Sequence, residues 1–170
     1  MAIIKPNNNT ISAITALPNG IVSSSALASG VGGKVLQVVS AHTATVTSCT
    51  SSTYIDTTLT ASITPSSSSN KVVVFVNQSF QKINSTHANF KMLRDSTDIG
   101  GSIPARAIGY TGTTIEIYFG MAFNYSFQDT PSSTSALTYK TQFNNAANNG
   151  TTRCQPDSSQ SYMLLMEVSG

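Results

Sequence analysis

Charged residues are scarce in this chain of 170 residues, of which only 9% are Asp, Glu, Lys or Arg. Globular domains usually carry about 25%. The net charge is +2 and the nine basic residues never form a run, so the chain lacks the basic patch typical of proteins that bind nucleic acid. We therefore expect no nucleic-acid partner.

Cysteine is also rare, and tryptophan is absent. The two cysteines, Cys49 and Cys154, are too few for a disulfide scaffold. They can pair only if their strands are neighbours, whereas a reducing cytoplasm favours free thiols. Both alternatives stay open at this point.

Long hydrophobic runs are missing as well. The longest, residues 72–76, is far too short to span a bilayer, so we expect no membrane partner. Residues 1–10 lack the apolar stretch of a signal peptide. This pattern favours assembly in a host cytoplasm and release by lysis over secretion.

Groups that carry catalysis or bind metals are few. There are two histidines, His42 and His87, and neither belongs to a metal-binding or nucleophile motif. We interpret both as solvated or loop histidines, with a metal or catalytic role as the less favoured alternative. The sequence predicts no enzyme, no cofactor and no metal site.

The acidic residues support the same interpretation. Asp95 and Asp98 are expected in a turn, because the remaining spacing of a calcium loop is absent. Glu116 and Glu167 lie between apolar residues in expected strands, and we expect both carboxylates to face outward.

Small polar residues replace the missing charge: there are 26 Ser, 22 Thr and 13 Asn. Thr favours strands, while Ser and Asn favour turns. Apolar alternation then predicts strands at residues 34–40, 57–64, 71–80, 88–93, 114–128, 136–143 and 162–168, with 43–47 continuing the first after a kink. The run in 71–80 is continuously apolar at its start, which predicts a central strand covered on both sides.

We predict an all-β fold, an antiparallel two-sheet sandwich of jelly-roll type with about eight strands. It occupies residues 34–170. Residues 1–33 hold no aromatic side chain and cannot build a core, so we interpret them as an extended attachment arm, with a disordered leader as the alternative. The candidate attachment residues are the aliphatic ones: Ile3, Ile4, Ile11, Ile14, Leu17 and Ile21.

Several segments resemble a known family. They are residues 33–40 (Gly-Lys-Val-Leu-Gln-Val-Val-Ser), 62–69 (Ser-Ile-Thr-Pro-Ser-Ser-Ser-Ser), 70–76 (Asn-Lys-Val-Val-Val-Phe-Val), 127–139 (Phe-Gln-Asp-Thr-Pro-Ser-Ser-Thr-Ser-Ala-Leu-Thr-Tyr) and 162–168 (Tyr-Met-Leu-Leu-Met-Glu-Val). In their order and spacing they resemble a virion structural or tail-fibre domain of tailed bacteriophages, particularly marine and cyanobacterial ones. The resemblance implies a virion role and a trimeric jelly-roll-like domain, and it implies no catalytic residue.

Two functions follow as expectations. The first is a capsid decoration (cement) or head-fibre protein on the virion exterior, a homotrimer anchored to the major capsid protein by residues 1–33. The alternative is a tail-fibre module that binds host cell-surface glycan through loops 96–105, 144–150 and 153–159, with Tyr110 and Tyr139 as stacking platforms. A depolymerase-like enzyme is disfavoured by the missing acid and base groups.

Overall fold

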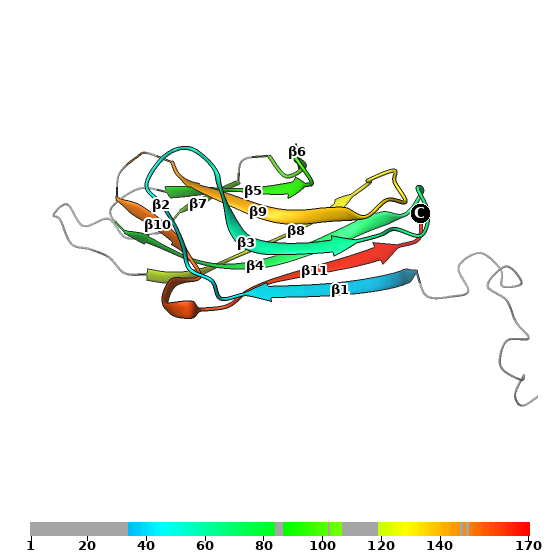
Figure 1. Ribbon diagram of the computed structural model, residues 1–170, viewed down its shortest axis with the longest axis horizontal. Helices are drawn as coiled ribbons and strands as arrows, with labels where there is room; N and C mark the ends of the chain where they lie inside the picture. Colours follow the sequence, from blue (N-terminus) through cyan, green and yellow to red (C-terminus); the bar gives the residue numbers. More distant parts are fainter. Residues whose placement is uncertain (1–33, 84–86, 102, 107–118, 147, 149) are drawn as a thin grey trace, which may run out of the picture. The chain divides into compact units, whose positions relative to one another are not determined.

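The computed structural model describes residues 34–83, 87–101, 103–106, 119–146, 148 and 150–170. Within the unit Val35–Gly170, two antiparallel sheets pack face to face (Figure 1). This confirms the all-β, two-sheet sandwich that the alternating pattern predicts. The predicted arm, including its six aliphatic residues, lies outside the described residues.

The first sheet, called sheet A, has the strand order β1-β11-β4-β10-β2, and β8 also pairs with β4. Its strands are β1 (Val35–Thr43), β2 (Thr47–Cys49), β4 (Lys71–Ile83), β8 (Phe119–Asp129), β10 (Thr151–Cys154) and β11 (Ser161–Val168). A single turn of 3-10 helix, η2 (Pro156–Ser158), lies between β10 and β11.

The second sheet, called sheet B, has the order β3-β9-β5-β6, and β7 also pairs with β5. Its strands are β3 (Ile55–Ile63), β5 (His87–Arg94), β6 (Thr97–Asp98), β7 (Ile103–Arg106) and β9 (Leu137–Asn145). The described residues thus contain eleven strands where about eight are expected, because short strands such as β2, β6 and β10 carry too few residues for a pattern.

The core follows the predicted alternation. Every second residue of β3 is buried, including Leu59, Ala61 and Ile63, and Ala88, Phe90 and Met92 of β5 are buried in the same way. These side chains fill the space between the sheets in two clusters. One gathers around Leu59 and Val74, and the other gathers around Phe80, Phe90 and Phe143.

A buried carboxylate joins the two sheets at one end of the sandwich. Arg94 Nη1 of β5 donates to both oxygens of Asp129 on β8, at 2.8 and 2.6 Å. The Tyr139 hydroxyl of β9 donates to Asp129 Oδ2 at 2.7 Å. Tyr139 is 0% exposed, so the prediction that it is a glycan-stacking platform is wrong: its ring belongs to the core.

A second carboxylate fixes the loop between β3 and β4. Glu167 of β11 accepts hydrogen bonds from the Ser66 backbone N–H, the Ser66 hydroxyl and the Asn70 amide, at 2.6, 2.7 and 2.6 Å. Glu167 is 1% exposed, so the expectation that it faces outward is wrong. Its partners come from residues about one hundred positions away, which strand alternation cannot indicate.

We expect Glu167→Gln to lower the free energy of unfolding at neutral pH and to make that free energy less dependent on pH in the acid range. Burial alone raises the pKa of the Glu167 carboxyl, but the Ser66 and Asn70 hydrogen bonds outweigh it and hold the pKa below its ordinary 4.5. A lowered folded pKa gives stability that is complete above pH 4.5 and is lost as the pH falls through the folded value. At neutral pH the variant should lose about 1.5–3 kcal/mol of unfolding free energy.

Urea unfolding of both proteins at a series of pH values measures this effect. The difference between wild type and Glu167→Gln should shrink as the pH falls below 4.5. A difference that stays constant down to strongly acid pH would contradict the role given to the Glu167 carboxylate.

The two cysteines lie on neighbouring strands but are not opposite one another. In the β10–β2 pair, Cys49 faces Thr152 and Cys154 faces Thr47. Both thiols are buried and free, and burial raises the pKa of Cys154 well above its ordinary value. The diagonal register accounts for the free thiols, because diagonal residues of a sheet are about 7–8 Å apart, near the upper limit for a disulfide.

Candidate assembly surface

The outer face of sheet A carries three aligned rows of side chains that cross four strands, and it continues beyond the first row to Val168 of β11 and Lys71 of β4. Strand pairing from β1 through β11 and β4 to β8 fixes each row. The first row is Val38, Met166, Val73 and Gln128; the second is Ser40, Leu164, Phe75 and Ser126; the third is His42, Tyr162, Asn77 and Asn124. None of these twelve residues is Asp, Glu, Lys or Arg.

Large apolar side chains project from this face into solvent. Val38 is 54% exposed and Phe75 is 43% exposed, while Leu164, Met166 and Val73 are half-buried. Over residues 71–79 of β4 only the inward residues, such as Val72 and Val74, are buried. β4 is central in sheet A as predicted, but the prediction that it is covered on both sides is wrong around Phe75, whose outward side chain no described residue covers.

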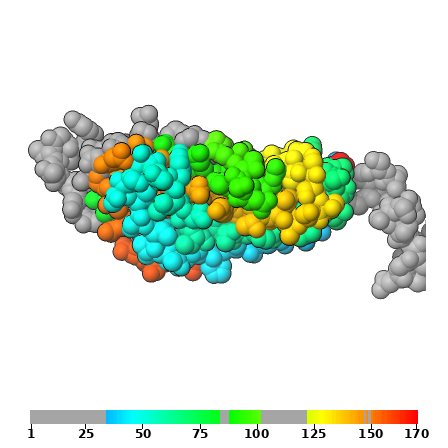
Figure 2. All heavy atoms as spheres, turned by 45° about the horizontal axis from the view of Figure 1, so that its top comes forward, coloured from blue at the N-terminus to red at the C-terminus, as the bar shows by residue number. Residues whose placement is uncertain are grey.

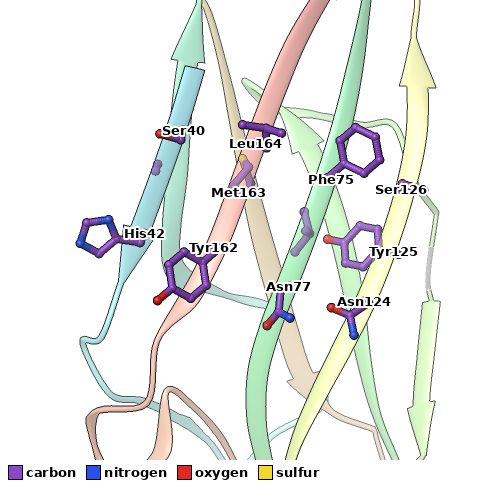
Figure 3. A pocket seen from close by; sticks show the side chains of 12 residues that line it. Ser40, His42, Phe75, Asn77, Asn124, Tyr125, Ser126, Tyr162, Met163 and Leu164 are labelled. Atoms are coloured by element: carbon purple, nitrogen blue, oxygen red, sulfur yellow. The ribbon is translucent and has the colours of Figure 1, made fainter. Parts of the chain in front are cut away.

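A hollow of about 600 Å³ lies on the same face (Figure 3). Its rim carries Phe75 from β4 and Tyr162 from β11 (Figure 3). Tyr162 is 51% exposed, and its ring centroid lies 6.1 Å from that of His42. The surface is thus uneven, with aromatic rings beside a depression.

The face changes character along the strands. Near the start of β1 it is aliphatic, whereas the third row holds the amides of Asn77 and Asn124 side by side on β4 and β8 (Figure 3). Neither amide is hydrogen-bonded to any residue that the structure describes. The hollow therefore combines exposed aromatic rings with amide hydrogen-bond donors and acceptors that have no partner among the described residues. No Asp, Glu, Lys or Arg lines it.

The outer face of sheet B has the opposite character; atoms of its strands β3 (cyan) and β5 (green) face the viewer in Figure 2. Lys140 of β9 forms an ion pair with Asp56 of β3 at 3.0 Å, and Gln142 donates to the same carboxylate at 2.8 Å. Lys91 of β5 pairs with Asp98 of β6 at 2.9 Å. Such a surface is well solvated by water. The outer face of sheet B therefore needs no protein partner to cover it, unlike the apolar rows of sheet A.

No protein-family model and no curated protein matches this chain. Within the residues that the structure covers, no helix is long and apolar enough to cross a membrane. Over the same residues, no three His, Cys, Asp or Glu side chains gather into a group able to hold a metal ion.

The residues singled out in the sequence are dispersed. His42 is exposed at the third row, as expected for a solvated histidine, whereas the side chain of His87, and all of Glu116 and Tyr110, lie outside the described part. Asp95 and Asp98 lie at the turn around β6, where Asp98 accepts a hydrogen bond from the Gly101 backbone N–H at 2.8 Å. The interpretation as a turn residue is confirmed for Asp95, whereas Asp98 is the last residue of the short strand β6.

The loops proposed to contact glycan are shorter than predicted. Asn144 and Asn145 belong to β9 and are buried, and the Asn144 amide donates to the Ser52 carbonyl at 2.8 Å. Likewise, Arg153 and Cys154 belong to β10. Sequence reasoning missed the outer face of sheet A, although the continuously apolar run 72–76 was the signal that could have found it.

Proposed function

We propose that this chain is a non-enzymatic structural protein of a tailed phage, displayed as a homotrimer on the exterior of the particle. In this proposal it is a capsid decoration (cement) or head-fibre protein, and residues 1–33 attach it to the major capsid protein. One observation carries the proposal: the outer face of sheet B holds paired charges, whereas three adjacent rows on the outer face of sheet A hold large exposed apolar side chains and no Asp, Glu, Lys or Arg. A surface of that kind serves contact with protein.

The strand order supports a jelly-roll type of sandwich, the architecture that we propose for this domain. Along the chain, β1 lies in sheet A, β3 in sheet B, β4 in sheet A, and β5 and β7 in sheet B. The order continues with β8 in sheet A, β9 in sheet B and β11 in sheet A. Such alternation of eight main strands between two sheets is what two Greek keys produce.

Deleting residues 1–33 tests the attachment. We expect full-length protein to co-sediment with purified undecorated phage heads in high copy number, and the truncated protein to remain in the supernatant. Three arms on one trimer act multivalently, so losing all of them should lower the apparent affinity by a factor of about 100 or more. Light scattering of the truncated protein serves as the control that the β domain still assembles.

Two outcomes would contradict this proposal. Heads that bind the truncated protein as well as the full-length protein would exclude residues 1–33 as the anchor. Full-length protein that binds no heads at all would exclude a decoration role and make the tail-fibre alternative the leading one.

One specific observation favours that alternative, a receptor-binding module for host cell-surface glycan. The exposed ring of Tyr162 beside the uncommitted amides of Asn77 and Asn124 offers a stacking surface with hydrogen-bonding groups, as neutral sugars require. In this case the contact would be made by the face of sheet A rather than by the predicted loops. Loss of binding to host cells on Tyr162→Ala would support it.

A further inference from the structure

We propose that the outer face of sheet A is buried against other copies of this chain, arranged around a rotation axis. This inference rests on the proposed structural role and names the partner of its apolar face. It assigns the interface to the first two rows, centred on Val38, Phe75, Leu164 and Met166. The hollow beside Phe75 receives side chains of the neighbouring copy.

The sequence of β4 indicates that something covers this face. Strands with continuous apolar runs are typical of sheets buried on both sides, and β4 reads Val-Val-Val-Phe-Val over residues 72–76. Sheet B covers the side that carries Val72, Val74 and Val76. The side that carries Val73 and Phe75 has no cover from the described residues of the same chain, which leaves it open to another molecule.

The absence of charge in the three rows favours an identical copy as that molecule. Around a rotation axis, residues near the axis meet the same residues of the next copy. A charged residue there would face its own charge, whereas an unlike partner would gain from charges of opposite sign. Asp, Glu, Lys and Arg occur on the outer face of sheet B, as in the Asp56–Lys140 pair, but not in these rows.

The polar groups of the rows also suit self-association. Ser40 and Ser126 of the second row each hold both a hydrogen-bond donor and an acceptor, so two identical sets can pair with one another. The relief of the face fits as well, because a projecting Phe75 or Tyr162 ring lies next to the hollow (Figure 3). In the proposed assembly, the Phe75 or Tyr162 ring of one copy lies over the hollow of the neighbouring copy.

Introducing a charge at exposed positions of the first two rows tests the interface. We would measure the molar mass of Val38→Asp and Phe75→Asp by size-exclusion chromatography with light scattering. Wild type should give a whole multiple of 17.8 kDa, three-fold for the proposed trimer, and both variants should give the single-chain mass. Val46→Asp is the matched control, since Val46 is 47% exposed but lies outside the rows, and it should keep the wild-type mass.

Thermal melting shows whether each variant is folded. Should either Asp variant fail to fold, Val38→Ser and Phe75→Ser replace it, and each should raise the concentration at which the oligomer dissociates by about tenfold. A monomeric wild type would overturn the inference. So would an oligomer whose mass none of these variants changes, or glycan binding by the wild-type oligomer that Tyr162→Ala abolishes.

The outcome is separable from that of the proposed function, because this measurement uses the protein alone. A full-length oligomer sensitive to Val38→Asp that binds no phage heads would refute the decoration role and support the interface. Head binding by a wild-type protein that is monomeric in solution would support the decoration role and refute the interface.

Discussion

Replacing Asp129 with alanine is expected to lower the free energy of unfolding by about 3 kcal/mol, because it removes the carboxylate that accepts charge-assisted hydrogen bonds in a partly buried ion pair. The substitution leaves the Arg94 guanidinium without its carboxylate and the Tyr139 hydroxyl without its acceptor. Both groups belong to sheet B while Asp129 belongs to sheet A, so the loss also loosens one end of the sandwich. Urea unfolding monitored by circular dichroism measures it.

Asp56→Ala is the matched control. Asp56 also pairs with a basic residue, Lys140, but on the solvated outer face of sheet B. Exposed ion pairs contribute between about 0 and 1 kcal/mol, so this variant should unfold almost like the wild type. Equal losses for Asp129→Ala and Asp56→Ala would show that burial does not set the strength of the Asp129 cluster.

Phe90→Ala should destabilise the sandwich by a similar amount, about 3–5 kcal/mol. Phe90 is fully buried, and its ring contacts three others at centroid distances of 5.3 Å for Phe80, 5.2 Å for Phe123 and 6.2 Å for Phe143. Phe80 and Phe123 come from sheet A, whereas Phe90 and Phe143 come from sheet B. Removing this ring leaves a cavity between the sheets.

Thermal and urea unfolding of Phe90→Ala and Phe90→Leu separate the cavity from the mere change of residue. Phe90→Leu keeps most of the buried apolar volume and should lose clearly less unfolding free energy than Phe90→Ala. Similar losses for both variants would indicate that ring-to-ring geometry, rather than filled volume, is what Phe90 contributes.

The sequence was a reliable guide wherever a strand buries one side. Alternation in residues 57–64 and 88–93 predicts the strands β3 and β5 and their inward residues, among them Leu59 and Phe90. The physical reason is that successive side chains of a strand point to opposite faces. Apolar residues at every second position therefore mark the core side directly.

Apolar alternation does not predict what covers the outward side of a strand. It also does not predict which residue forms a hydrogen bond with a given polar side chain. Glu167 is buried because Ser66 and Asn70 reach it from a distant loop, and Tyr139 is buried together with Asp129. Asn144 and Asn145, whose residue type favours turns, extend β9 because they bind the loop of residues 50–53. Each of these depends on long-range contacts that a local pattern does not contain.

The sequence contains a signal for the candidate surface, the apolar run of β4, that the sequence analysis did not interpret as an interface. The apolar run of β4 predicts cover on two sides, and the described part of the chain provides it on one. The proposed self-association would account for this mismatch between a two-sided apolar pattern and one-sided burial. It becomes visible only when the outward residues of β1, β11 and β4 are aligned by their pairing.

Because Cys49 and Cys154 lie diagonally and form no disulfide, the fold does not depend on whether its surroundings are reducing or oxidising. Both thiols are buried and unpaired, and the raised pKa of Cys154 keeps that side chain in its unreactive protonated form. The covalent structure of the domain is then the same under reducing and oxidising conditions. A protein assembled in a reducing compartment can enter an oxidising one without a chemical maturation step.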